Sequence, residues 1–335
     1  MRKLLCISLV LVLAAIWVGC GDSSHSLAPT SNVLFVRQLG SPGVANLARG
    51  HEMRRLQSRL VVPPAPLGAR PLVLAAGDQT VVMMKNDGSN QKVLTSQGET
   101  GTFEAVQLSL DGKMAVGSAL DDQGYLQIFV VNMANLNNLQ PTQLTSDPEH
   151  HYVPQLSPDK KTVIFVKENT TTYMPQAFTI KVSGGAETAI STPSGTSVNF
   201  PSYTPDGNKI VFEEEENDTI SIMNLDGTGI KNLTDGTYFD EFPSVTADGK
   251  TIVFSRYGKD TEMAGEEIFS MNIDGSGLKQ LTSSGAQKDS WDPIVVNDKI
   301  LYIFGYGNVY GMNLDGTNQK NLTNSSNVEF FIGGE

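Results

Sequence analysis

The chain contains few of the residues on which disulfide scaffolds, metal sites and nucleic-acid interfaces depend. Two of its 335 residues are cysteine and four are histidine. Basic residues are also scarce, because 24 Lys and Arg stand against 36 Asp and Glu and leave a formal net charge of −12. This charge balance excludes general binding to nucleic acid or to an anionic membrane surface. Hydrophobic residues nevertheless make up 39% of the chain, which is enough for a packed core.

Motifs of known catalytic classes are missing as well. The sequence has no G-x-S-x-G, C-x-x-C or H-E-x-x-H and no Gly loop that would cradle a phosphate. Arg256 is the only arginine from Pro71 to Glu335, which excludes a cluster of arginines that grips a carboxylate. No loop offers oxygen ligands with EF-hand spacing. We therefore favour a protein that is not an enzyme, and we expect no cofactor.

Long apolar runs occur only at the N-terminus. Arg2 and Lys3 precede the run Leu4–Val18, which is short for a membrane span and typical of a secretory signal peptide, predicted here over residues 1–19. The run ends in "WVGC", which resembles the lipobox of bacterial lipoproteins and makes Cys20 the expected lipidation site. An ordinary signal peptide is the alternative. The other cysteine, Cys6, lies inside the signal, so the exported chain would form no internal disulfide.

Residues 20–70 are predicted to form a tether between this anchor and the folded domain. The stretch "GDSSHSLAPTS" has the composition of a linker. Met53, Leu56 and Leu60 stand at helical spacing among four arginines and indicate a short basic helix. Such a helix would pack on the domain or be attracted to anionic headgroups near the anchor. We expect a protein of the bacterial cell envelope, lipid-anchored at the membrane and facing the periplasm or the cell surface.

The rest of the chain, residues 71–335, repeats three markers in a fixed order. The first is a phrase such as "PSYTPDGNKIVF", whose turn aspartate recurs every 42 to 50 residues at Asp111, Asp159, Asp206, Asp248 and Asp298. The second is a "MNLDG"-like turn, and the third is a Leu-Thr pair, as at Leu233 and Leu281. A period of this length indicates a repeat architecture rather than a chemical motif.

Each repeat is predicted to form four short strands. Asp-Gly supplies the positive φ that tight hairpins need, and the strands carry successive apolar residues such as "IVF" instead of strict alternation. This pattern predicts small antiparallel sheets that are covered on both faces. Sheets stacked around an axis cover each other in this way, so the fold class is an all-β propeller.

The number of repeats gives the number of blades. Five units begin near Val106, Pro154, Pro201, Pro243 and Pro293. Before them, Leu72–Thr95 supplies only three strands, the first of which is "LVLAA", and after them Asn327–Gly334 supplies one. We therefore predict six four-stranded blades, with the ring closed by the C-terminal strand in the first sheet, which leaves no edge exposed. The segment Val33–Arg37 is an alternative source of the closing strand.

The phrase "SPDGKxIxF…IxxMNxDGxxxxxLT" resembles the TolB-type WD40-like (PD40) repeat of bacterial propellers. The resemblance covers about Leu72 to Gly334 and implies the propeller fold. True WD40 repeats match poorly, because the only tryptophans are Trp17 and Trp291.

Charge is expected to differ between the two faces of the ring. Loops between strands one and two and between strands three and four carry Asp-Gly turns balanced by lysines. The opposite side, which we call the variable-loop face, bears the loops between strands two and three and the links between blades. Variable loops on a rigid scaffold are where binding usually resides. The candidate binding residues on this face are Asp121, Asp122, Asp147, Glu149, Glu214, Glu215, Glu216, Asp218, Asp240, Glu241, Asp260, Glu262, Glu266 and Glu267.

Two functions follow from these observations. The first is a non-enzymatic, envelope-anchored propeller that binds a protein or glycan partner, of basic character, through the acidic variable-loop face; a face that only keeps the protein soluble is the alternative. The second is a metal-dependent lyase or lactonase that uses the central mouth of the propeller. The only weak metal-ligand candidates are His150 and His151, beside Asp147 and Glu149. We predict no metal there, because adjacent histidines are usually part of a polar loop.

Overall fold

The architecture comes from a computed structural model that describes residues 32–38, 79–89, 91–93, 103–109, 113–132, 141–168, 174–190, 192–193, 195–259, 265–285, 288–305, 307–324 and 328–331. Every regular element within these ranges is a β-strand. The same ranges contain no helix long and apolar enough to cross a membrane. The predicted signal peptide, Cys20 and the predicted basic helix lie outside them.

Five blades are formed by consecutive strands. The first contains β4 (Phe103–Leu108), β5 (Met114–Leu120), β6 (Leu126–Asn132) and β7 (Pro141–Gln143). The second contains β8 (His151–Leu156), β9 (Thr162–Glu168), β10 (Pro175–Lys181) and β11 (Thr188–Ala189). The third contains β12 (Asn199–Tyr203), β13 (Lys209–Glu214), β14 (Thr219–Asn224) and β15 (Lys231–Asn232). The fourth contains β16 (Tyr238–Val245), β17 (Thr251–Gly258), β18 (Glu267–Asn272) and β19 (Lys279–Gln280). The fifth contains β20 (Ser290–Val296), β21 (Lys299–Phe304), β22 (Asn308–Asn313) and β23 (Lys320–Asn321).

The prediction of a six-bladed propeller of four-stranded blades is wrong, because the described residues form five blades from consecutive strands. Only five blades are contiguous, and their outer strand is two or three residues long beside three strands of five to eight residues. In place of the first predicted blade there is a composite sheet in the order β24-β1-β2-β3, built from β24 (Val328–Phe331), β1 (Asn32–Gln38), β2 (Gln79–Lys85) and β3 (Lys92–Val93).

The composite sheet differs from the prediction in its second strand. The prediction placed Leu72–Ala76 there, and this is wrong, because β1 pairs with β2 over seven residues, from Asn32 opposite Lys85 to Gln38 opposite Gln79. The C-terminal strand does join this sheet, but it pairs with β1, where Phe330 lies opposite Val36. Short apolar segments are interchangeable in composition, so only the register of pairing decides which one enters the sheet. The chain thus contributes to the propeller well before residue 71.

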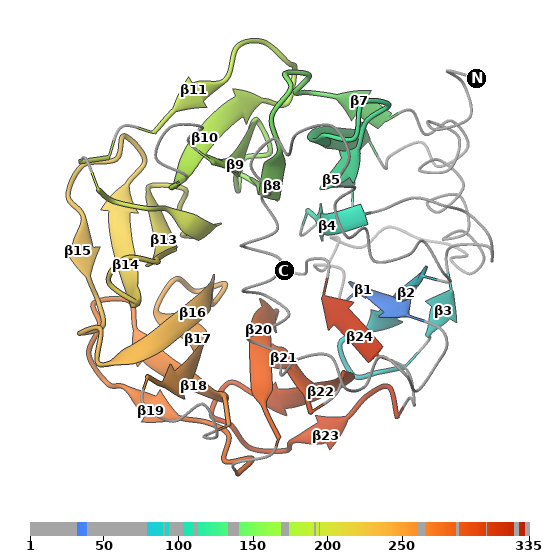
Figure 1. Cartoon of the computed structure of the whole chain (residues 1–335). Helices are drawn as coiled ribbons and strands as arrows, with labels where there is room; N and C mark the ends of the chain where they lie inside the picture. Colours follow the sequence, from blue (N-terminus) through green and yellow to red (C-terminus); the bar gives the residue numbers. More distant parts are fainter. Residues whose placement is uncertain are drawn as a thin grey trace, which may run out of the picture.

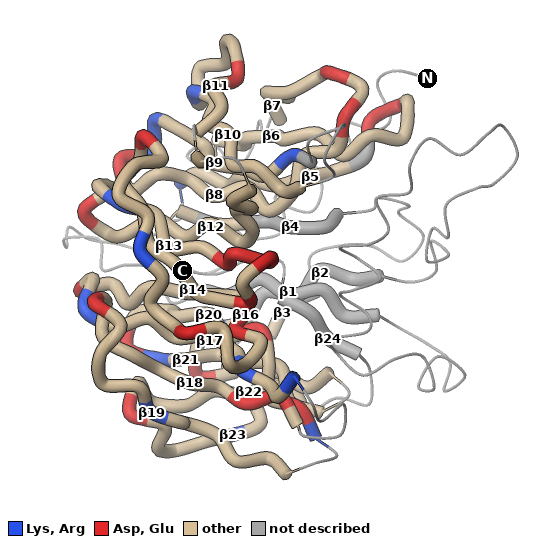
Figure 2. Tube along the Cα trace, turned by 60° about the vertical axis from the view of Figure 1, so that its left-hand side comes forward, with Lys and Arg blue, Asp and Glu red and all other residues tan. Residues whose placement is uncertain are grey.

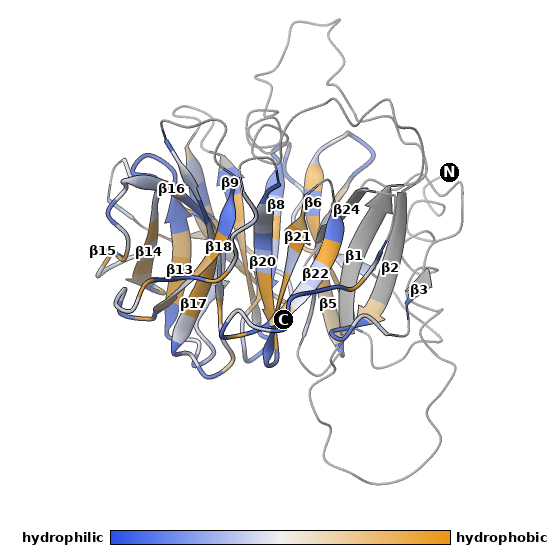
Figure 3. Cartoon of the chain, turned by 90° about the horizontal axis from the view of Figure 1, so that it is seen from below, coloured by the Kyte–Doolittle hydropathy of each residue, from blue (hydrophilic) through white to orange (hydrophobic). Residues whose placement is uncertain are grey.

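The sheets stand in a ring, with the first strand of each blade near the centre and the fourth at the periphery (Figure 1). Hydrophobic residues occupy the middle of the strands, and hydrophilic residues lie at both ends (Figure 3). Each apolar cluster lies between two neighbouring sheets. Phe212 of β13, for example, packs with Ile164 of β9, and Phe254 of β17 packs with Val211 of β13. Both faces of a blade are therefore covered, which explains why the strands read as continuous apolar runs.

The first repeated marker is a hydrogen-bonded turn between strands one and two. In the third blade the Thr204 hydroxyl donates to Asp206 Oδ1 at 2.6 Å and accepts the N–H of Lys209 at 3.0 Å. Asp206 Oδ1 also accepts the N–H of Asn208 at 3.1 Å, and Gly207 has a φ of 71°. The second and fourth blades repeat the contact between hydroxyl and carboxylate at 2.7 Å. Ser or Thr, Asp and Gly thus recur for turn geometry.

The other two markers have similar local causes. In the "MNLDGT" turn, Asp226 Oδ1 accepts from both the N–H and the hydroxyl of Thr228, at 3.0 and 2.6 Å. In the Leu-Thr pair, the N–H of Leu233 donates to the carbonyl of Ile220, and the Thr234 hydroxyl accepts the N–H of Ile220 at 3.0 Å. The threonine thereby extends an outer strand that is only two residues long. The three repeated markers are architectural.

Acid is expected to destabilise the fold through these turns. Hydrogen bonds from the neighbouring hydroxyl, and then from the backbone, lower the pKa of the turn aspartates below 3.8 at Asp159, Asp206, Asp226, Asp248, Asp274 and Asp315. A carboxyl whose folded pKa is depressed contributes stability above its unfolded pKa, and this is lost as the pH falls through the folded pKa. The melting temperature should therefore drop steeply below about pH 4. In the triple variant Asp226→Asn/Asp274→Asn/Asp315→Asn, the melting temperature should fall less below about pH 4 than it does in the wild type. An equal fall in both proteins would show that the turn aspartates do not cause the acid sensitivity.

Hydrogen bonds between blades also follow the repeat. The Lys231 ammonium donates to the carbonyl of Asp274 in the next blade at 2.7 Å, and Lys279 repeats the contact on Asp315 at 2.7 Å. Near the centre, the side chain of Gln107 accepts the N–H of Leu156 in the following blade at 2.6 Å. The lysines beside the Asp-Gly turns therefore hold neighbouring blades together, besides balancing charge.

The innermost strands of four blades share a bulge just before a proline. Val153, Phe200, Phe242 and Asp292 each precede a proline and have φ between 42° and 56°. At each of them the register between strands one and two shifts. A left-handed conformation is strained for a residue other than glycine, above all for a β-branched one such as Val153. The proline that follows also removes a donor from the inner edge of the sheet.

Candidate functional site

The two faces of the ring are organised as the sequence indicates. The N–H of Val182, in a loop between strands three and four, donates to the carbonyl of Lys161, in a loop between strands one and two, and Ile273 makes the same contact with Lys250. These two loop types therefore share a face. Charged residues gather mainly at the ends of the strands (Figure 2). Of the predicted binding residues, Asp260 and Glu262 lie outside the described residues.

Several predicted acids are buried and paired within the fold. Asp240, 1% exposed, binds Arg256 with two parallel bonds, from Nε to Oδ1 at 2.6 Å and from Nη2 to Oδ2 at 2.9 Å. Glu267, 9% exposed, accepts the Thr282 hydroxyl at 2.5 Å and the Ser284 hydroxyl at 3.0 Å. Glu214 and Glu266 are also buried. These carboxylates serve the structure of the blades and cannot meet a partner directly.

A second group of acids is partly exposed and engaged. Asp218 binds the Lys259 ammonium at 2.6 Å. Glu216 Oε2 accepts the N–H of Ser197 at 3.1 Å and also the hydroxyl of Ser197. Asp121 accepts the N–H of Gln123 at 2.8 Å in its own turn. The exposed acids of the described face are therefore fewer than the sequence suggests.

The loop after β13 in the third blade lies against the turn before β16 in the fourth, where a Cβ added at Gly236 would fall 2.5 Å from the carbonyl oxygen of Asn217. Glu215 and Glu216 are exposed in the loop after β13, and Tyr238 at the start of β16 is 42% exposed. Phe239 stacks on Tyr257 with ring centroids 4.8 Å apart. We give the name acidic–aromatic surface to Glu215, Glu216, Tyr238, Phe239 and Tyr257.

Two cations of the chain already use the rings of this surface. The Arg256 guanidinium lies over the Tyr238 ring at 4.8 Å, and the Lys259 ammonium lies over the Phe239 ring at 5.3 Å. Lys259 is bound by the Asp218 carboxylate at the same time. Carboxylate and ring together thus hold an ammonium group, which is the chemistry expected for a basic ligand.

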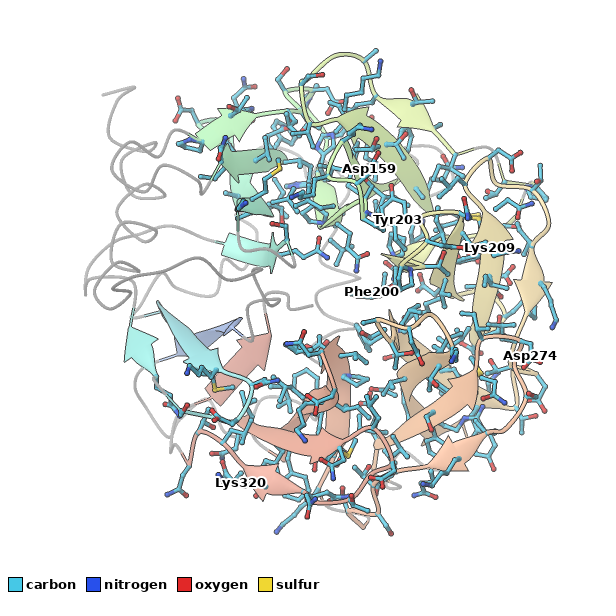
Figure 4. The ribbon with its side chains drawn as sticks, turned by 180° about the vertical axis from the view of Figure 1, so that it is seen from behind. Asp159, Phe200, Tyr203, Lys209, Asp274 and Lys320 are labelled. Atoms are coloured by element: carbon cyan, nitrogen blue, oxygen red, sulfur yellow. The ribbon has the colours of Figure 1, made fainter. Side chains whose placement is uncertain are left out.

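Phe200 and Phe242 connect this surface to the centre of the ring. Their rings meet edge to face with centroids 4.3 Å apart. Phe200 lies at the inner edge of its sheet, whereas Asp274 and Lys320 lie at the outside of the ring (Figure 4). The strained bulges thus bring two aromatic side chains together near the centre, and neither periodicity nor composition could have predicted this.

The two histidines hold the start of β6 to the next blade. His150 Nδ1 accepts the N–H of Leu126 at 3.1 Å, while His151 Nδ1 lies 3.0 Å from the carbonyl of Leu126. Burial, with a smaller contribution from His151, lowers the pKa of His150. His150 is therefore a neutral acceptor that uses Nδ1 for the backbone. His151 points its other nitrogen elsewhere.

That nitrogen faces a cluster that the sequence did not reveal. His151 Nε2 lies 3.3 Å from Asp147 Oδ1 and 3.2 Å from Glu187 Oε1. The other oxygens of both carboxylates bind the Lys167 ammonium at 2.6 and 3.0 Å, and Glu149 binds it at 2.7 Å. Burial opposes the charge on Lys167, but these three carboxylates outweigh it and raise the pKa of the ammonium. We call these five residues the His151 cluster.

Lys167 and Glu187 were absent from the predicted site. Lys167 interrupts the apolar run of β9, "TVIFVKE", and a lysine in such a run could have signalled a buried pair. Glu187 gave no signal, because it comes from the turn after β10 and reaches the cluster only in the folded blade. Asp147 and Glu149 were predicted as binding residues, and both are engaged by Lys167.

Comparisons with known proteins agree on the architecture. Residues 76–296 match the family described as the TolB beta propeller domain (PD40). TolB from Acinetobacter baumannii is 16% identical with a TM-score of 0.58, covering 86% of this chain and 62% of that chain. Hydrazine synthase from Kuenenia stuttgartiensis is 15% identical with a TM-score of 0.60, covering 91% of this chain and 47% of that chain.

At these identities the structural likenesses show the fold alone, and this chain spans less than two thirds of the A. baumannii TolB chain and about half of the hydrazine synthase chain. A comparison with curated proteins found no match. The family match extends over more than half of the residues and agrees with the repeat, the turns and the ring of sheets. The chain therefore belongs to the TolB β-propeller (PD40) family.

Proposed function

We propose that this protein is a non-enzymatic binding propeller of the bacterial cell envelope that holds a basic segment of a protein partner on its acidic–aromatic surface. The observation that carries the proposal is that the loop of exposed Glu215 and Glu216 lies against the turn that precedes the exposed ring of Tyr238. Membership of the TolB propeller family supports a role in protein binding. The proposal narrows the predicted acidic face, because Glu214, Asp240, Glu266 and Glu267 are buried.

The partner is basic because the surface already binds cations of its own chain. Lys259 lies between the Asp218 carboxylate and the Phe239 ring, so an incoming lysine or arginine would meet the same two kinds of group at Glu215 and Tyr238. Arginine and lysine are attracted to aromatic faces and to carboxylates together. A glycan partner would use the rings and depend little on the carboxylates, which makes its binding insensitive to charge reversal.

Crosslinking in intact cells tests the surface. A photo-crosslinking residue at position 238 should capture a discrete protein, and Glu215→Lys should reduce the yield several-fold because it reverses a charge of the acidic–aromatic surface. Asp298→Lys is the matched control: Asp298 is 77% exposed in a turn on the opposite face, and its reversal should leave the yield unchanged. Equal yields from both variants would refute the proposed surface.

The envelope location rests on the apolar leader and on the "WVGC" sequence. We propose that Cys20 carries the lipid that anchors the protein to the membrane. Labelling of cells with a fatty-acid analogue should mark the wild-type protein, and Cys20→Ala should abolish the label and release the protein from the membrane fraction. A Cys20→Ala protein that keeps its label would overturn the anchor.

A lyase or lactonase at the central mouth remains the alternative function. The His151 cluster does not favour it, because His151 is fully buried and Lys167 is 8% exposed between the first two contiguous blades. His151 contacts the ring of Phe165, at 5.4 Å between centroids, within the apolar layer of these blades. This position suits a structural role.

A further inference from the structure

We propose that the His151 cluster is a binding site for one Zn²⁺ ion, held by His151 Nε2, Asp147 Oδ1 and Glu187 Oε1, which ties the link between the first two contiguous blades to the second of them. These three atoms lie within 4.8 Å of one another. The proposal goes beyond partner binding, because it concerns a metal site inside the fold. It stands on the hydrogen bonding, geometry and charge of the cluster.

The two groups that face His151 Nε2, Glu187 Oε1 and Asp147 Oδ1, are both acceptors. Nδ1 lies 3.0 Å from the carbonyl of Leu126, which can only accept, so Nδ1 carries the proton. A neutral imidazole then presents a lone pair at Nε2, yet Nε2 faces oxygens of two carboxylates. Two acceptors and a lone pair repel unless a proton or a metal lies between them. Asp147 Oδ1 is itself buried without a hydrogen-bond partner.

The arrangement around His151 is the one found in metal sites. A histidine that binds a metal almost always donates its other N–H to a carbonyl, carboxylate or water, which fixes the ring and aims the free nitrogen. His151 makes this contact with Leu126. The ring is completely buried and also packs against Phe165, so Nε2 is held in place.

Two of the three distances between ligand atoms fit Zn²⁺. In a tetrahedral site with bonds of about 2.0–2.1 Å, neighbouring ligand atoms are about 3.3 Å apart. Nε2 lies 3.3 Å from Asp147 Oδ1 and 3.2 Å from Glu187 Oε1. One nitrogen and two carboxylate oxygens are ligands that Zn²⁺ accepts, and three protein ligands leave a fourth position for water.

The charges also call for a divalent ion. Asp147, Glu149 and Glu187 bring three carboxylates, against which Lys167 sets one ammonium group. Lys167 binds the oxygens Asp147 Oδ2 and Glu187 Oε2, which leaves Oδ1 and Oε1 toward His151. One Zn²⁺ ion would offset the excess of carboxylates without displacing the lysine.

Zinc binding by matched variants tests the site. The full-length protein is stripped with a chelator, dialysed against Zn²⁺ and analysed for zinc per chain, and its affinity is measured by calorimetric titration. We expect one equivalent in the wild type, and an affinity lower by roughly tenfold or more in Glu187→Gln. Glu149→Gln is the control, because Glu149 binds Lys167 but is not among the three ligand atoms, so this variant should keep the site.

Two further readouts keep the proposal falsifiable if a variant folds poorly. Zinc should raise the melting temperature of the wild type and of Glu149→Gln but not of Glu187→Gln. Imidazole nitrogen NMR of the wild type should show no proton on His151 Nε2 when zinc is present. A wild type without stoichiometric zinc, equal losses in the two variants, or a proton on Nε2 at saturating zinc would overturn the site; the proton would instead explain the geometry as an imidazolium.

Discussion

Asp240→Ala is expected to lower the free energy of unfolding by about 3–5 kcal/mol. Asp240 and Arg256 form a two-bond ion pair in which the carboxylate is fully buried and the guanidinium side chain is 9% exposed. The guanidinium is also enclosed by rings, at 5.5 Å from Phe254 and 5.2 Å from Phe269. Without Asp240, a charge that cannot deprotonate would remain in this apolar surrounding.

Arg256→Ala should be less damaging than Asp240→Ala. Burial raises the pKa of Asp240, although the hydrogen bonds from Arg256 oppose this shift. With the arginine removed, the carboxyl can take up a proton and become neutral, an escape that Arg256 lacks. A larger loss of unfolding free energy in Asp240→Ala than in Arg256→Ala would therefore indicate an unpaired buried charge, not lost packing.

Urea unfolding of both single variants and of the double variant Asp240→Leu/Arg256→Met measures these effects. The double variant should come within about 1–2 kcal/mol of the wild type, because replacing both partners by apolar groups leaves no unpaired charge. A double variant as unstable as Asp240→Ala would show that the two hydrogen bonds of the ion pair stabilise the fold in a way that apolar side chains cannot replace. Equal losses in the two single variants would contradict the role of the raised carboxyl pKa.

Phe212→Ala is expected to cost about 3–5 kcal/mol of unfolding free energy. Phe212 is fully buried between the second and third contiguous blades, where it packs with Ile164, Tyr203 and Met223. Truncation would open a cavity between the two sheets, because this part of their interface is filled by the Phe212 ring. Phe212→Leu keeps most of the volume and should cost less than half as much.

Leu225→Ala provides the control for Phe212. Leu225 belongs to the same blade and to the repeated "MNLDG" turn, but it is 42% exposed. Its replacement should change the unfolding free energy by no more than about 0.5 kcal/mol. If Phe212→Ala and Leu225→Ala lowered the unfolding free energy by similar amounts, the division of the repeat into buried strands and exposed turns would be wrong.

Much of each contiguous blade could be predicted because its causes are local. The phrase around Asp206 predicts a turn, since the hydroxyl, carboxylate and glycine that close it lie within six residues. The Leu-Thr pair correctly marked the outer strand, although not its shortness. The C-terminal strand of the composite sheet was predicted, but its partner β1 was not, because β1 and β24 meet from opposite ends of the chain and no local pattern distinguishes β1 from Leu72–Ala76.

The candidate site was predicted only in part. Glu215 and Glu216 lie at the exposed surface as expected for a loop, but Asp240 and Glu267 are buried by partners that approach from other strands. Counting charges along a loop cannot distinguish an exposed carboxylate from one that is held by a guanidinium across the sheet. The same limit hid Lys167 and Glu187, whose carboxylate–ammonium contact spans twenty residues of sequence.

The sequence by itself determined the β-propeller fold, the contiguous blades and the chemistry of their turns, because each depends on hydrogen bonds and periodicity within a few neighbouring residues. The tertiary structure alone decided which segments complete the composite sheet, which acids remain exposed, and that His151 meets Asp147 and Glu187. These features depend on the register between distant strands and on the desolvation of charges between blades, and neither quantity is encoded in any single stretch of the chain.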